Sequence, residues 1–274
     1  MKTAINLSFL SAWVSQYDAV PLVKKAGFDG CFIDATSPEI DLSAIAAHAR
    51  ENGLELQSVH APFTHMDAMW EEGKAGDEAL EELIDCLRRS YAAGAPIMVV
   101  HAFIGFGEEH PTAIGVERFG KLVREAEALG MLIAFENTEG ESYLDMLLTQ
   151  LGDNPAVGFC IDTGHEMCYN RSRDLIGKYG DKLIATHLND NMGITGPEIF
   201  WHDDSHLFPF DGIADWAGIA ARIKKTGFSG FLTFELTTHN KPNRTTHDRY
   251  AHLDAEGVLA LAHEKALAFA AMMD

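Results

Sequence analysis

Short apolar runs recur along this chain, and each is followed by a stretch in which apolar residues return every three or four positions. The runs are rich in branched and aromatic side chains, which is typical of strands buried on both faces of a parallel sheet. The stretches between them are typical of amphipathic helices. The predicted strands cover residues 3–8, 30–34, 54–60, 96–103, 131–136, 157–162, 183–189 and 231–236.

Helices are predicted between these strands from the same periodicity and from glycines that follow their last turns. An irregular loop is expected at residues 66–76, over the pocket, and residues 190–212 form the one long connection. Regular strand-then-helix units without a linker predict one α/β domain over residues 1–274, a single (β/α)8 TIM barrel. The predicted helices cover residues 17–26, 41–53, 77–93, 142–151, 175–179, 215–226 and 254–272, and one more ends at Gly130.

Six of the predicted strands end in a side chain that is able to bind a metal ion. In a barrel of parallel strands these ends lie on one face, where the active site is found. A carboxylate beside an apolar core is costly to bury unless a cation or a donor compensates it. A positive group is therefore expected to face Asp162, which ends the sixth strand. The six residues are His60, His101, Glu136, Asp162, His187 and Glu235.

The last four of these residues end the fifth to eighth strands, which are neighbours around the barrel. Two glutamates, an aspartate and an imidazole form a mixed oxygen and nitrogen shell. Such a shell suits Mn²⁺, Mg²⁺, Co²⁺ or Zn²⁺ better than copper or an iron–sulfur cluster. The sequence therefore predicts one divalent metal ion at Glu136, Asp162, His187 and Glu235. The alternative is a set of strand-end carboxylates that only accept hydrogen bonds from loop amides.

Composition narrows the classes of partner. The 274 residues are 47% hydrophobic and 23% charged, with a net charge of -20, which argues against a broad nucleic-acid-binding face. The four cysteines form no CxxC and are interpreted as reduced, buried thiols. The N-terminus lacks the pattern of a signal peptide, and no apolar run is long enough to span a membrane. We expect a cytoplasmic protein, and the sequence is compatible with a homo-oligomer.

A set of short segments at the predicted strand ends resembles a known family. They are Ser58-Val-His60-Ala-Pro-Phe, Val99-Val-His101, Phe135-Glu136-Asn137, Asp162-Thr-Gly-His165, His187-Leu-Asn-Asp190, Asp204-Ser-His206-Leu-Phe-Pro-Phe-Asp-Gly212 and Phe234-Glu235. Together they resemble the xylose isomerase-like TIM barrel superfamily. That group contains sugar isomerases and epimerases, inosose dehydratases and endonuclease IV.

The epimerase branch of this superfamily implies one set of roles. Glu136, Asp162, His187 and Glu235 would hold one divalent ion, and both glutamates would also act as acid and base. A metal polarises a carbonyl and its neighbouring hydroxyl, which lowers the cost of the enediolate formed when a base removes the proton between them. The expected substrate is a small sugar, a sugar phosphate or a cyclitol. A dehydratase is close to this class.

The endonuclease IV branch implies a different set, in which nine residues hold three zinc ions. His60 and His101 would join Glu136, and the four ligands above would share the second ion. The third ion would lie among His165, Asp204 and His206. A multi-zinc phosphodiesterase is therefore the alternative function.

In sugar enzymes such histidines bind substrate hydroxyls instead. The acidic chain and the lack of an Arg-rich, glycine-flanked loop favour the sugar-enzyme interpretation. They also argue against a nucleic acid partner. A non-catalytic metal-binding barrel is a third alternative.

Residues beyond the strand ends complete the predicted pocket. Aromatic side chains there could form an apolar wall for a sugar ring or could simply anchor loops: Trp13, Phe63, Phe103, Trp201 and Phe208. Cations that follow the eighth strand could bind a phosphate, but a solvated loop is the simpler interpretation: Lys241, Arg244 and Arg249.

Overall fold

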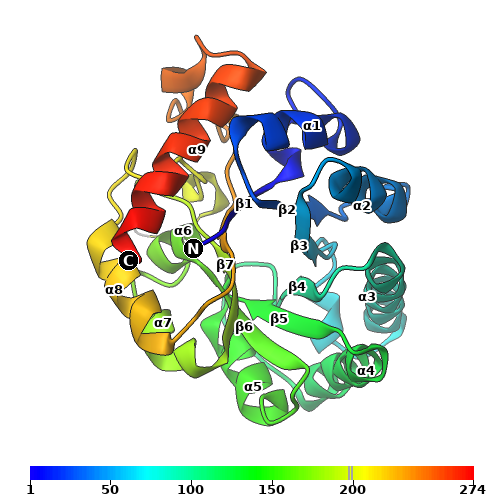
Figure 1. The fold of residues 1–274 in the computed structure, drawn as a ribbon. Helices are drawn as coiled ribbons and strands as arrows, with labels where there is room; N and C mark the ends of the chain where they lie inside the picture. The colour runs from blue at the N-terminus through cyan, green and yellow to red at the C-terminus, as the bar shows by residue number, and fades with distance from the viewer. Residues whose placement is uncertain (197, 199) are drawn as a thin grey trace.

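The computed structural model describes residues 1–196, 198 and 200–274. Its strands form one parallel sheet in the order β7-β6-β5-β4-β3-β2-β1-β8. The sheet closes into a barrel where Leu188, just after β7, pairs in parallel with Phe234 of β8, which confirms the predicted (β/α)8 TIM barrel (Figure 1). The strands are β1 (Thr3–Asn6), β2 (Gly30–Asp34), β3 (Glu55–His60), β4 (Ile97–His101), β5 (Leu132–Glu136), β6 (Val157–Asp162), β7 (Leu183–His187) and β8 (Leu232–Phe234).

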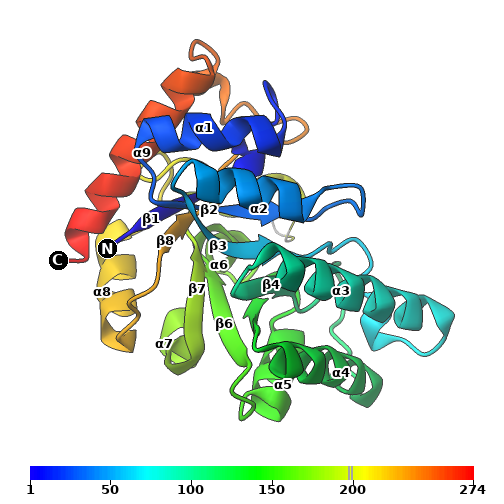
Figure 2. The same ribbon diagram turned by 45° about the vertical axis from the view of Figure 1, so that its right-hand side comes forward.

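Helices surround the strands, and α9 packs beside α1 and α8 (Figure 2). Helix α3 begins at Lys74, earlier than predicted, and the short helix α6 was not predicted. Within the described residues, no helix is long and apolar enough to cross a membrane. The helices are α1 (Gln16–Ala26), α2 (Leu42–Glu51), α3 (Lys74–Ala93), α4 (Ala113–Leu129), α5 (Glu141–Leu151), α6 (Thr163–Cys168), α7 (Leu175–Tyr179), α8 (Trp216–Thr226) and α9 (Ala255–Met272).

Aspartates fix where many of these helices begin. Each accepts a hydrogen bond from the backbone N–H three residues later, which satisfies one of the free donors of the first turn. The far ends of α3 and α4 are closed by Gly94 and Gly130, whose φ values of 82° and 71° favour glycine. The capping aspartates are Asp41, Asp162, Asp174, Asp215 and Asp254.

Alternation along the strands places the site residues inside the barrel. Successive side chains of a strand point to opposite faces, so residues two apart share a face. The small apolar cluster inside the barrel contains Val99, Ala134, Cys160 and Ala185. Each of them precedes a strand-end His, Glu or Asp by two positions. The interior is therefore filled with small apolar side chains at one level and with polar side chains at its C-terminal end.

Residues 66–73, between β3 and α3, pack on α4 and do not line the cavities at the barrel mouth, contrary to the expectation of a loop over the pocket. Arg118 of α4 is only 2% exposed. Its guanidinium donates to the backbone carbonyls of Met69 (3.0 Å) and Gly73 (3.1 Å) and pairs with Asp77 (3.0 Å). A single buried cation thus satisfies carbonyls of a segment that has little regular structure of its own.

Replacing Arg118 with Met should lower the free energy of unfolding by about 3 kcal/mol, because buried carbonyls lose their donors. Chemical denaturation measures this change. The exposed Arg124 lies on the same helix, and Arg124→Met should change stability by less than about 0.5 kcal/mol. Equal effects of the two substitutions would show that the buried contacts do not stabilise the loop.

Candidate metal centre

The six predicted strand-end groups converge at the C-terminal mouth of the barrel. Five of them are the last residues of β3 to β7, and Glu235 follows the short strand β8 by one position. Because parallel strands end on the same face, these side chains meet without help from the loops. The five strand-end residues are at most 8% exposed, whereas the side chain of Glu235 is 17% exposed.

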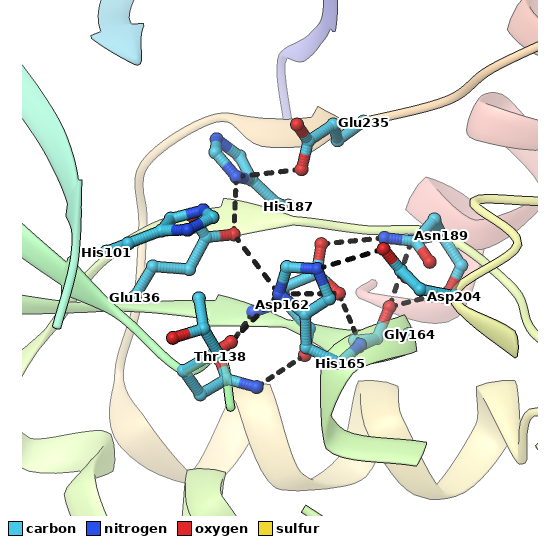
Figure 3. Close-up of polar contacts among 12 residues, drawn as sticks. His101, Glu136, Thr138, Asp162, Gly164, His165, His187, Asn189, Asp204 and Glu235 are labelled. Atoms are coloured by element: carbon cyan, nitrogen blue, oxygen red, sulfur yellow. Dashed lines mark hydrogen bonds and ion pairs between the residues drawn. The ribbon is translucent and has the colours of Figure 1, made fainter. Parts of the chain in front are cut away.

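The carboxylate of Glu136 lies at the centre of this arrangement (Figure 3). Its Oε2 is 3.2 Å from Nε2 of His60 and 3.4 Å from Nε2 of His101. Its Oε1 is 2.9 Å from Nδ1 of His187, which is also 3.2 Å from Oε2 of Glu235. The two oxygens of one buried carboxylate therefore face different histidines.

Histidine protons balance the buried negative charge. Burial opposes ionisation of Glu136, but the positive charge of His187 and hydrogen bonds from His101, His187 and His60 hold the pKa of Glu136 well below its usual range. Burial would lower the pKa of His187, yet nearby negative groups, including Glu136 and Glu235, raise it well above its usual range. A cluster that binds protons this strongly offers the same atoms to a divalent cation.

The four ligands predicted for one ion come together. One ligand atom from each of Glu136, Asp162, His187 and Glu235 lies within 4.8 Å of all the others. Metal–ligand distances of about 2 Å would bring such atoms within roughly 4 Å of one another, so small side-chain movements suffice. Three carboxylates at this position need a compensating cation, and the residues present therefore fit a divalent metal ion.

Backbone and amide donors fix Asp162 in place. Its Oδ1 accepts the N–H of His165 at 2.7 Å, which starts helix α6, and its Oδ2 accepts Nδ2 of Asn189 at 2.7 Å. A positive group was expected to face Asp162, and the nearest imidazole nitrogen, Nδ1 of His165, is 3.8 Å away. Burial, opposed only in part by the positive charges of His165 and His206, raises the pKa of Asp162 to about 7. Gly164 is required here, since a Cβ would lie 1.9 Å from Oδ1 of Asn189.

Two further groups of donors adjoin the first. Oδ2 of Asp204 lies 3.0 Å from Nε2 of His206 and 3.5 Å from Nε2 of His165, which unites the third predicted set. Ligand atoms of His60, His101 and Glu136 lie within 4.8 Å of one another, as do those of Asp162, His165 and His206. All nine residues singled out in the sequence therefore lie in one connected cluster, joined through Glu136 and Asp162.

A cavity of about 460 Å³ lies over this cluster, lined by histidines, Glu235 and aromatic side chains. Phe63 and Trp201 form part of its wall, which was one of the two roles left open for them. Trp13 lines a neighbouring cavity of about 730 Å³ that shares Phe63 and Glu235 with the first. Phe208 is completely buried against Tyr250 and belongs to the core. The mouth of the barrel thus offers a partly enclosed space, with aromatic side chains in its wall, above the buried carboxylates.

The cations after β8 have different surroundings. Lys241 lines the cavity, with its Nζ 3.5 Å from Oδ2 of Asp204. Arg244 pairs with Asp203 at 2.7 Å, and Arg249 donates to the carbonyl of Asp211 at 2.7 Å. Two of the three cations are therefore engaged in loop contacts, as expected for a structural role.

Sequence reasoning missed three residues of the site. Asp34 ends the run Gly30-Cys-Phe-Ile-Asp34, the same pattern as the other strand ends, and lines the neighbouring cavity of about 730 Å³ together with Glu235. Asn189 orients Asp162 from beyond β7. Glu139 lines the cavity over the cluster from the segment between β5 and α5. Asp34 had a readable signal, whereas the other two depend on how loops fold back.

The chain is similar to known proteins in family, in sequence and in structure. The sequence model described as xylose isomerase-like TIM barrel matches residues 20–256. An uncharacterized protein of Sinorhizobium fredii, y4fM, is 30% identical over 231 residues, which cover 78% of this chain and 68% of that protein. A probable endonuclease 4 of Cenarchaeum symbiosum is 27% identical over 157 residues, which cover 52% of this chain and 54% of that protein. The chain thus spans about half to two thirds of these relatives.

Solved structures with the same fold include sugar epimerases. D-psicose 3-epimerase of Clostridium cellulolyticum, solved with D-tagatose, has a TM-score of 0.75 at 18% identity, with all of both chains covered. The IolI protein, solved with a zinc atom, has a TM-score of 0.79 at 17% identity, with 100% of this chain and 99% of that chain covered. At such low identity these matches concern the fold alone.

The stability of the chelator-treated protein should fall as the pH rises above neutrality. Burial would lower the pKa of His206, but Asp204 outweighs it and raises this pKa from 6.5 to about 9. The stabilisation that this proton provides is complete below pH 6.5 and is lost as the pH rises through about 9. His60, His165 and His187, whose pKa values are also raised, act in the same direction.

Denaturation curves between these two pH values test this linkage. His206→Gln should make the decline smaller, by up to about 3 kcal/mol. His239→Gln, at an exposed loop position, should leave the decline unchanged. A pH-independent stability for the chelated wild-type protein would contradict the expected coupling between Asp204 and His206.

Proposed function

The chain belongs to the xylose isomerase-like TIM barrel family, and on that premise we propose that it is a divalent-metal-dependent isomerase or epimerase of a small sugar or cyclitol. The observation that carries the proposal is the convergence of ligand atoms from Glu136, Asp162, His187 and Glu235 within 4.8 Å, beneath a partly enclosed cavity. These four residues would hold the ion. When bound, it would polarise a substrate carbonyl and the neighbouring hydroxyl, which makes the proton between them easier to remove.

Glu235 is the residue that we assign to proton removal. It lines the cavity, and its side chain is 17% exposed, so a substrate can reach its carboxylate. Burial opposes ionisation of Glu235, but the positive charge of His187 and the hydrogen bond between them lower its pKa to about 2. The group is therefore ionised at neutral pH, as a base must be, and it is a weak base for as long as its contact with His187 lasts.

Glu136 has less access to the cavity than Glu235. It is completely buried, and His60 and His101 both contact its Oε2. Its proposed second role, as the acid that returns a proton, requires the two imidazoles to move aside. Its role as a ligand requires no such movement. Substitution of Glu235 should therefore affect mainly turnover, whereas substitution of Glu136 should also weaken metal binding.

Histidines on the cavity wall suit recognition of substrate hydroxyls. His101 is an example: burial, only partly opposed by its hydrogen bond to Glu136, lowers its pKa to about 4. The neutral ring keeps one donor and one acceptor, and its Nδ1 has no partner among the described residues. Aromatic rings beside such polar groups match the mixed faces of a sugar, and a cavity of about 460 Å³ is of suitable size.

Deuterium exchange tests the proposed chemistry. The protein supplied with Mn²⁺ or Co²⁺ should catalyse incorporation of solvent deuterium next to the carbonyl of a ketose, detected by NMR across a panel of sugars and cyclitols. Glu235→Gln should reduce exchange at least about 100-fold while it retains part of the metal affinity. Glu136→Gln should weaken metal binding as well as exchange.

Glu81 provides a matched control, because it is exposed on α3. Glu81→Gln removes the same charge and should leave exchange and metal binding unchanged. Full exchange activity in Glu235→Gln would exclude this residue as the base.

The second candidate function is a multi-zinc phosphodiesterase. It is supported by the two additional donor groups, which share Glu136 and Asp162 with the first. Curated relatives named probable endonuclease 4 from three organisms also point to it. Against it stand the net charge of -20 and a cavity partly walled by Phe106, Tyr169 and Trp201, which suit a small ligand better than a duplex.

Incubation with abasic duplex DNA separates the two functions. The zinc-loaded protein should leave such DNA intact at low and physiological salt, because phosphates are repelled by an acidic surface. Gel electrophoresis detects any incision. Zinc-dependent incision that is lost in His206→Gln would make the phosphodiesterase the better assignment.

A further inference from the structure

Glu139 lies where two cavities meet. One is the cavity of about 460 Å³ over the candidate metal centre, and the other is an outer cavity of about 510 Å³. Both are lined by Glu139, Gly105, Phe106 and Tyr169. A ligand that extends from the metal centre toward solvent on this side therefore passes the Glu139 carboxylate.

This carboxylate is buried and forms no ion pair among the described residues. The residue is only 9% exposed, and among the described residues the hydrogen bond that its side chain receives comes from its own backbone N–H. Burial, opposed only in part by that bond and by the positive charges of His165 and Lys241, raises the pKa of Glu139 to about 7. A charge removed from water in this way is costly unless an opposite charge joins it. The cavities on both sides are where such a charge can come from.

The walls around Glu139 favour a cation. Three more glutamates line the outer cavity, against one arginine, Arg171. The rings of Phe103, Phe106 and Tyr169 complete the wall, and aromatic faces attract ammonium groups through their negative quadrupole. Two of the glutamates already have neighbours, since Glu109 accepts the N–H of Ser142 and Glu108 lies near His110. The Glu139 carboxylate, in contrast, is buried and remains available to a ligand.

The nearby cations do not provide an anion site. Lys241 lies 3.5 Å from Asp204 and its Nζ is 5.6 Å from the centre of the Trp201 ring. Arg244 is paired with Asp203. A phosphorylated sugar would have to displace these contacts and would bring its charge near Glu139, which like charges oppose.

We propose that the two joined cavities bind a polyhydroxy compound that carries a protonated amine, an amino sugar or amino cyclitol, with its ammonium group beside Glu139. This inference rests on the proposed function and names its substrate class. The hydroxyl and carbonyl oxygens would lie toward Glu235 and the histidines, and the ammonium would lie toward Phe106 and Tyr169. The carboxylate of Glu139 would then gain the partner that the folded chain does not supply.

Calorimetric titration of the metal-loaded protein tests this assignment without a need for turnover. The probes are D-glucosamine and 1-amino-1-deoxy-D-fructose, with D-glucose, D-fructose and N-acetyl-D-glucosamine as uncharged counterparts. At least one amine should bind about tenfold more tightly than its neutral counterpart. Equal or tighter binding of the neutral sugars, or no binding of either amine, would overturn the proposal.

Glu139→Gln keeps the shape of the side chain and should abolish this preference, so that an amine binds no more tightly than its neutral counterpart. Glu264→Gln removes one exposed negative charge from α9 and should retain the preference, which separates a local contact from the net charge. A preference that persists in Glu139→Gln also overturns the proposal. Deuterium exchange into neutral ketoses without any preference for amines would leave the proposed function standing and remove only this inference.

Discussion

The burial of the Glu136 carboxylate at the open end of the barrel is the constraint on which the site depends. A wholly buried carboxylate requires positive charge or donors around it, and here three imidazoles from β3, β4 and β7 supply them. Small apolar residues beneath, such as Ala134 and Cys160, leave room for this layer. The same donors that bind protons in the metal-free chain are those that would bind a divalent cation, so protonation and metal binding compete for one set of atoms.

The metal-binding side chains alone do not distinguish proton transfer from phosphodiester hydrolysis, because both chemistries use carboxylates and imidazoles around metal ions. The surroundings distinguish them. Of the two glutamates among the predicted metal ligands, Glu235 lines the cavity, while Glu136 is buried behind His60 and His101. The walls are aromatic and acidic, and the chain carries a net charge of -20. These features suit a small polyhydroxy ligand, and the isolated carboxylate of Glu139 suits one that carries an amine.

The sequence predicted the barrel and the strand-end groups well, because both follow from short-range patterns. A buried strand that ends in Glu136 or Asp162 is readable from neighbouring residues, and parallel strands bring such ends together. Asp34 carried the same signal and was missed. Helix α6, Asn189 and Glu139 could not be predicted, since their positions depend on how segments far apart in the chain pack together. The extent of β8 was also overestimated, and Glu235 lies just beyond it.

Metal content per chain tests the central claim most directly. Elemental analysis would be made on protein purified without chelators or a metal-binding tag, for wild type and for Asp162→Asn. We expect about one divalent ion per wild-type chain, replaceable by Mn²⁺ or Co²⁺, and a large loss in the variant. Two or three tightly held zinc ions would contradict the single-ion account and favour the phosphodiesterase. A wild-type chain that holds no divalent ion when the ion is supplied in excess would contradict a metal centre at Glu136 altogether.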